Sequence, residues 1–113
     1  MRCEKEDVEP PNHYKIGTEY SITPDLSFTI KSISDSRCPE GAVCVWEGDV
    51  LMDFVINEGN KVIDTTMNLN YHRNNPLVFG GFRFEIQDVI PYPVYGEEML
   101  PDDVRVVIDL ISQ

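Results

Sequence analysis

The chain has 113 residues, of which 42% are hydrophobic and 26% charged, as expected for one folded domain with its own core. Nine basic and twenty acidic residues give a formal net charge of −11. A field of that sign repels phosphate backbones and anionic lipid. The chain is therefore not expected to bind nucleic acid, and it has no apolar run long enough to span a membrane.

Residues 1–13 are charged, include a proline pair and show no apolar period, which predicts a flexible tether. Cys3 and the acidic residues after it resemble the mature start of a bacterial lipoprotein, in which a lipidated cysteine precedes such a tether. Lys5 and the two acids after it resemble the surface-export signal of Bacteroidota lipoproteins. Arg2 departs from the small residue that normally precedes the lipidated cysteine. The alternative is therefore a free cysteine on an extended end.

Residues 14–113 are predicted to form a single domain of short strands, because apolar side chains alternate and turn residues interrupt them often. Residues 14–22 are predicted to form a first strand, followed by a turn at 23–25. In the next strand Leu26, Phe28 and Ile30 alternate with polar residues, which places these three side chains on the core side.

Cys38 and Cys44 have five residues between them, including Pro39 and Gly41. This spacing predicts a small disulfide-closed loop that leads into extended structure at 43–46, with a bulge or bend at Gly48. Redox pairs usually have two intervening residues, and a zinc site needs four ligands, so a structural disulfide is the better interpretation. Such a bond persists in an oxidising compartment, which predicts export.

A hairpin is predicted at 50–71, with its turn at 57–60, where Gly59 supplies the positive φ that a tight turn requires. The predicted inward positions are Val50, Met52, Phe54, Ile56, Ile63, Thr65, Met67, Leu69 and Tyr71. Residues 72–76 are predicted to be a polar loop.

Residues 77–79 form a short apolar run before Gly80 and Gly81, which indicate either a tight turn or a bulge. A strand follows at 82–87, then a long proline-rich loop, then a final strand at 104–111. That last strand is apolar on both faces, so it is predicted to lie centrally in its sheet. No segment has a helical period. The pattern predicts an all-β antiparallel sandwich of about seven short strands, immunoglobulin-like or jelly-roll-like.

Several residues are candidates for binding a partner. Tyr92, Tyr95 and Met99 lie on the proline-rich loop, where aromatic side chains either contact a partner or cap the open end of the sandwich. Arg37 either projects from a rigid loop, as in protease inhibitors, or pairs with a nearby acid. Trp46 either packs over the disulfide or offers a stacking platform for sugar.

Catalytic chemistry has little support in the sequence. The two histidines fall in predicted loops, no nucleophile motif accompanies them, and no calcium-loop spacing is present. We therefore expect a protein that is not an enzyme and that uses no metal and no cofactor.

The string Asp35-Ser36-Arg37-Cys38-Pro39, followed by Val43-Cys44-Val45-Trp46 and Gly48, resembles a motif of small secreted or lipid-anchored bacterial proteins. Many of these are from Bacteroidota, and they have no assigned activity. The resemblance implies export and supplies no active site.

These observations predict an exported, non-catalytic binding or accessory module of the cell envelope, or an extracellular one. It would contact protein or glycan through its loops, and would touch a membrane only through a lipid anchor at Cys3. The alternative is an inhibitor of an extracellular enzyme that uses the loop around Arg37 and Cys38.

Overall fold

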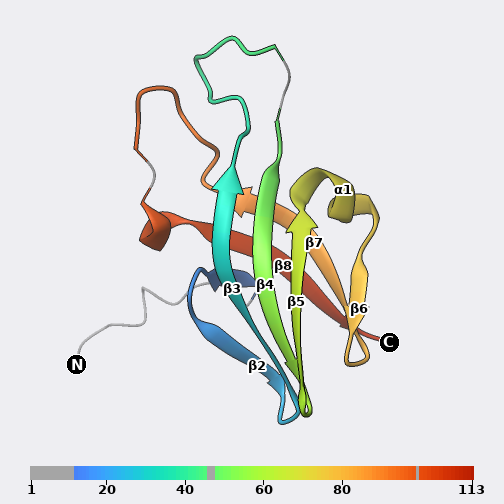
Figure 1. Cartoon of the computed structure of the whole chain (residues 1–113). Helices are drawn as coiled ribbons and strands as arrows, with labels where there is room; N and C mark the ends of the chain where they lie inside the picture. The colour runs from blue at the N-terminus through green and yellow to red at the C-terminus, as the bar shows by residue number, and fades with distance from the viewer. Residues whose placement is uncertain (1–11, 46–47, 99) are drawn as a thin grey trace, which may run out of the picture.

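The computed structural model describes residues 12–45, 48–98 and 100–113, and they form a β-sandwich of two four-stranded antiparallel sheets (Figure 1). The first sheet contains β2 (Glu19–Thr23), β3 (Leu26–Asp35), β4 (Val50–Glu58) and β5 (Lys61–Asn68). The second contains β1 (His13–Lys15), β8 (Arg105–Ser112), β7 (Phe82–Ile90) and β6 (Leu77–Phe79). A short helix, α1 (Leu69–Asn74), links the sheets, and a 3-10 turn at Pro101–Asp103 precedes β8. The predicted antiparallel sandwich is confirmed.

The first sheet is a meander, whereas the second combines a meander of β6, β7 and β8 with β1, which pairs with β8. The first sheet has the order β2-β3-β4-β5, and the second has the order β1-β8-β7-β6. The described residues thus contain eight strands, one more than the approximate number predicted. Their connectivity is simpler than the Greek-key connections of immunoglobulin-like and jelly-roll sandwiches.

The core lies between the two sheets and is built around Phe28. Its ring centroid lies 5.1 Å from that of Tyr14, 5.7 Å from Tyr20 and 6.0 Å from Phe54. Phe84, from the opposite sheet, lies 5.5 Å away in an edge-on arrangement. Such edge-on contacts are favourable beyond the area they bury, so Phe28 joins the sheets. The buried hydrophobic residues are Leu26, Phe28, Ile30, Val50, Met52, Phe54, Ile56, Met67, Leu69, Phe84, Ile86, Val89, Val104, Val106 and Ile108.

Several predicted features are confirmed. The β4–β5 turn contains Gly59 at φ 62°, and β8 lies between β1 and β7, inside its sheet. The open choice at Gly80 and Gly81 is resolved as a tight turn between β6 and β7. Both glycines have positive φ, as a two-residue hairpin turn of the primed type requires.

The predicted first strand at 14–22 was wrong as a single element. Gly17 takes a positive φ of 86° and divides it. The segment before Gly17 belongs to β1, in the second sheet, and the segment after it belongs to β2, in the first sheet.

The prediction that the inward-facing positions of the second hairpin strand continue to Tyr71 was wrong. The prediction of a polar loop at residues 72–76 was also wrong. The β5 strand ends at Asn68, and α1 follows. Leu69 and His72, three residues apart on one helix face, are buried, whereas Tyr71 is exposed. His72 Nδ1 accepts a hydrogen bond of 2.8 Å from the Asn68 amide. This short helix lacks a sequence period because Leu69 and His72 are its only buried side chains among those that the structure describes.

The extended structure predicted at 43–46 is absent from residues 43–45, which form no strand. Val43, Cys44 and Val45 are all exposed, so no ladder and no core contact holds them extended. Trp46 lies outside the described residues. The part of the chain that the structure describes contains no helix with the length and apolar character that a membrane crossing requires.

Candidate functional site

Two loops project from the same end of the sandwich (Figure 1). The cysteine loop, residues 36–49, connects β3 to β4, and the proline loop, residues 91–100, connects β7 to β8. The Glu40 amide donates to the Pro93 carbonyl at 2.9 Å, and the Tyr95 amide donates to the Glu40 carbonyl at 2.9 Å. These bonds make a parallel bridge between Glu40 and Val94. The two loops therefore form one surface, which we call the loop end.

The base of the cysteine loop is closed by hydrogen bonds between Ser36 and Asp49. The Ser36 amide and hydroxyl donate to the Asp49 carbonyl at 2.8 and 2.9 Å, and the Asp49 amide donates to the Ser36 hydroxyl at 3.1 Å. Gly48 lies so close that a Cβ there would meet the Ser36 carbonyl oxygen at 1.9 Å, and its φ is 73°. Only glycine fits at position 48, and this close approach holds the first and last residues of the cysteine loop together.

Asp49 also joins the loop base to α1. Its Oδ1 accepts from the Val50 amide at 2.7 Å and from the Asn70 amide at 3.0 Å. Asn70 Nδ2 in turn donates to the Gly48 carbonyl at 3.1 Å. The carboxylate satisfies an amide in the first turn of the helix, which would otherwise lack an intrahelical partner.

The predicted disulfide between Cys38 and Cys44 is present, with its Cα atoms 5.9 Å apart. The Cys38 carbonyl accepts a hydrogen bond of 2.8 Å from the Tyr92 hydroxyl, on the proline loop. The disulfide therefore fixes the ring at the point where the second loop contacts it. Such a bond is compatible with an extracellular or envelope location.

Arg37 lies inside the loop end rather than on its surface. Its Nε and Nη2 donate to the two carboxylate oxygens of Asp35 at 2.9 and 2.7 Å. Its guanidinium carbon lies 4.7 Å from the centroid of the Tyr92 ring, and Nη1 is 3.9 Å from Asp88 on β7. The side chain is only 8% exposed. A residue that enters the specificity pocket of a protease must project freely, so this geometry argues against inhibition through Arg37.

Six of the eleven large hydrophobic side chains that are exposed in the described residues lie on the loop end, and the other five are Leu51, Val62, Tyr71, Val78 and Ile111. Val43 is fully exposed, Val45 is 92% exposed and Tyr95 is 70% exposed. Tyr92, Val94 and Leu100 add partly exposed apolar area on the proline loop. Grouped apolar side chains on the surface of a charged domain mark interaction sites more often than scattered ones do.

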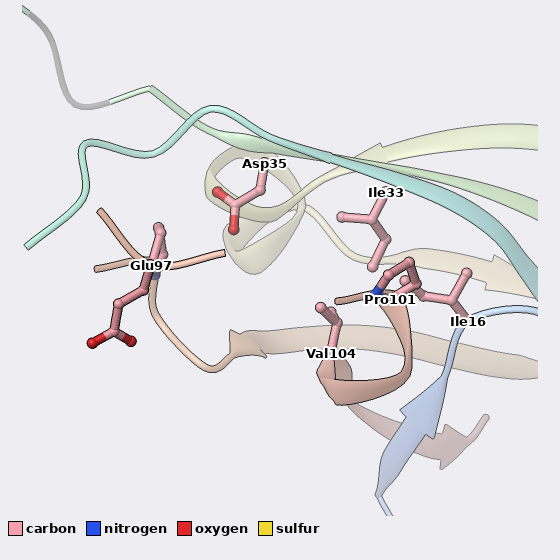
Figure 2. A pocket seen from close by; sticks show the side chains of 7 residues that line it. Ile16, Ile33, Asp35, Glu97, Pro101 and Val104 are labelled. Carbon is pink, nitrogen blue, oxygen red and sulfur yellow. The ribbon is translucent and has the colours of Figure 1, made fainter. Parts of the chain in front are cut away.

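Two hollows lie beside the proline loop and share Glu97 at their rim. The first, of about 340 Å³, is shown in Figure 2 and is lined by Ile16, Ile33, Asp35, Pro93, Glu97, Pro101 and Val104. In that view Ile33 faces Pro101 and Val104, while the Glu97 carboxylate stands apart from the apolar group. The second hollow, of about 320 Å³, is lined by Pro91, Tyr92, Val94, Glu97, Glu98 and Asp103. Both hollows combine apolar walls with carboxylates.

The remaining candidates do not add to this surface. His72 is buried, and its Nδ1 is occupied by a backbone amide, so the imidazole serves the start of α1. Met99, Cys3 and Trp46 lie outside the described residues. Within residues 12–45, 48–98 and 100–113, no three histidine, cysteine or acidic side chains are grouped so that they could hold a metal ion.

Sequence reasoning missed Val43 and Val45 as surface residues, because their alternation around Cys44 imitates a strand. The disulfide, which the sequence does predict, is the signal that could have placed Val43 on the surface, because Val43 lies inside a short closed ring.

Comparisons of the chain with protein-family models, with curated proteins and with solved structures find no match.

Proposed function

We propose that the chain is an exported, non-catalytic binding module that docks a protein partner on its loop end. The observation that carries the proposal is the full exposure of Val43, together with the near-full exposure of Val45 and the exposure of Tyr95, on loops that are fixed to each other. Burying solvent-exposed apolar side chains against a partner lowers the free energy and so favours binding. The Cys38–Cys44 disulfide and the bridge between Glu40 and Val94 already restrict the two loops, which lowers the cost of ordering them on binding.

The chemistry of the exposed groups favours protein over glycan as the partner. Proteins bind glycans by stacking aromatic rings on the sugar and by donating and accepting hydrogen bonds through polar side chains. Among the described residues of the cysteine loop, the exposed large hydrophobic side chains are Val43 and Val45, which offer neither. Aliphatic and aromatic anchors grouped at the centre of a patch are typical of protein interfaces.

The same proposal includes a cell-envelope location with a lipid anchor at Cys3. It rests on the disulfide and on the likeness of residues 3–7 to a lipoprotein start. The protein purified from the membranes of its own host is expected to carry a diacylglycerol-type adduct. Mass spectrometry of a digest is expected to place it on the peptide that contains Cys3. An unmodified thiol there would remove the anchor from the proposal without affecting the loop end.

Partner capture from the host envelope tests the binding role. We expect Val43→Ser with Val45→Ser, and separately Tyr95→Ala, to abolish recovery of a partner that the wild-type protein enriches, and to abolish its binding when the purified components are recombined. Neither change removes a core side chain, so the free energy of unfolding measured in urea is expected to stay within about 0.5 kcal/mol of the wild type.

Val62→Ser is the matched control. Val62 is a valine of comparable exposure, at 67%, but it lies beside the β4–β5 turn, at the opposite end of the sandwich. It is expected to leave capture unchanged. Equal loss of capture in the control, or full capture by both loop-end variants, would show that the partner binds elsewhere.

A further inference from the structure

Carboxylates surround the apolar part of the loop end. Glu40, Glu97 and Glu98 on the loop end, and Asp102 and Asp103 in the 3-10 turn that follows it, are all exposed. No ion pair among the described residues involves any of them. The basic side chains at this end are engaged instead, since Arg37 pairs with Asp35 and Arg105 donates to the Asp102 and Val104 carbonyls.

The second hollow brings charge and apolar area together. Tyr92, Val94 and Pro91 form its apolar walls, and Glu97, Glu98 and Asp103 supply its carboxylates. A long basic side chain fits this combination, because its methylene stem packs on apolar walls while its charged head reaches the acids. The adjoining first hollow is also bordered by Asp35 and Glu97. Asp35 is already paired with Arg37, and the walls formed by Ile16, Ile33, Pro101 and Val104 accept an apolar side chain.

We infer that the partner presents a basic side chain beside an apolar one, on a protein surface of net positive charge. This inference rests on the proposed docking of a protein at the loop end, and it adds the chemistry of that partner. The basic residue enters the hollow beside Tyr92, and the apolar residue enters the hollow beside Ile33. The net charge of −11 steers such a surface toward the domain and repels acidic competitors.

A displayed library of random peptides about twelve residues long probes this chemistry directly. Peptides are selected on the disulfide-intact protein and then depleted against the triple variant Glu97→Gln, Glu98→Gln and Asp103→Asn. We expect the surviving peptides to carry Lys or Arg next to an aliphatic or aromatic residue. Their affinity is expected to fall about tenfold or more on the triple variant, and to weaken as salt rises.

The matched control is Asp25→Asn, Glu58→Gln and Asp64→Asn, which removes the same number of charges away from the loop end. It is expected to change affinity by less than about twofold, since distant surface charges are screened. Affinity that falls equally on both triple variants would reduce the effect to net charge and overturn the inference.

A third variant separates this inference from the proposed function. Peptides that lose binding with Val43→Ser and Val45→Ser, yet are acidic or neutral and insensitive to the first triple variant, would overturn the basic partner and keep docking at the loop end. Peptides indifferent to the valine changes would overturn the docking itself. Absence of any peptide that distinguishes the wild type from the triple variant would also count against the basic partner.

Discussion

Arg37 shows how a residue that sequence suggests for recognition serves structure instead. Its guanidinium makes a two-pronged contact with Asp35, lies over the Tyr92 ring and reaches toward Asp88. These partners come from β3, the proline loop and β7, so one side chain ties both sheets to the loop end. The sequence offered both an ion pair and a free basic residue, and only the fold could decide between them.

We predict that Arg37→Lys lowers the free energy of unfolding by about 1–2 kcal/mol, because a lysine keeps the charge but loses the two-pronged contact and the stacking on Tyr92. Urea unfolding followed by far-ultraviolet circular dichroism measures it. Arg83→Lys is the control, since the Arg83 pair with Glu85 is more exposed than the Arg37 pair and is worth at most about 1 kcal/mol. Equal effects at both positions would contradict the structural role of Arg37.

Asp53 gives the domain a specific dependence on acid pH. The hydroxyl of Thr66 donates to Asp53 Oδ1 at 2.8 Å, and that of Ser32 donates to Oδ2 at 3.1 Å. These bonds, with a smaller contribution from the charge of Lys31, hold the pKa of Asp53 below its ordinary value. A carboxyl with a lowered folded-state pKa stabilises the fold above its unfolded pKa, and that contribution is lost as pH falls through the folded value.

We therefore predict that wild-type stability falls more steeply below about pH 4 than that of Asp53→Asn, since the unfolded pKa of an aspartate is about 3.9. Thermal unfolding midpoints collected between neutral and acid pH measure the difference. Asp64→Asn removes an exposed charge from β5 without removing these hydrogen bonds, and it should follow the wild-type curve. Parallel curves for Asp53→Asn and the wild type would contradict the assignment.

Among the elements, the long alternating strands could be predicted from sequence because one face of each is buried. The rows containing Phe28, Phe54 and Ile108 all lie in the core as their period of two requires. Short elements could not be predicted from the sequence for the same physical reason. They bury too few side chains to produce a recognisable hydrophobic period. The three residues of β1 and the six of α1 are held by contacts from distant parts of the chain, β8 for the strand and Gly48 and Asp49 for the helix.

Two bulges were missed although the sequence carries their trace. Pairing slips between Ile30 and Ser32 in β3, and between Ile86 and Asp88 in β7. At each bulge the inward-facing positions switch from even to odd residue numbers. Ile33 is therefore the next inward side chain after Ile30, and Val89 is the next after Ile86. An apolar spacing of three inside a strand of period two is the signal. The bulge in β3 also turns Ile33 and Asp35 toward the first hollow.

The disulfide is the element-scale feature on which the cysteine loop depends. We predict that Cys38→Ser with Cys44→Ser lowers the free energy of unfolding by about 2 kcal/mol, because a short ring removes a modest amount of entropy from the unfolded chain. Urea unfolding without reductant measures this. The sandwich itself should remain folded, since its core lies outside the ring. An unchanged midpoint would show that the disulfide does not stabilise the folded domain.

At the scale of the whole molecule, the sandwich serves as a rigid support that brings two distant segments together. Sequence placed candidate residues on both loops, but as rival sites, because nothing in a linear chain indicates that residues 40 and 94 are neighbours. Their bridge is a product of topology, since β3, β4, β7 and β8 all meet the loops at one end. The two candidate loops thus form one surface.

The association of the cysteine loop with the proline loop can be tested most directly by amide hydrogen exchange at Glu40 and Tyr95. Their N–H groups make the hydrogen bonds between the two loops. Exposed loops otherwise exchange near the rate of an unstructured peptide. We predict clear protection of both amides in the disulfide-intact protein, and loss of that protection in Cys38→Ser with Cys44→Ser while amides of β4 and β8 stay protected. Unprotected Glu40 and Tyr95 in the intact protein would contradict a single, ordered loop end.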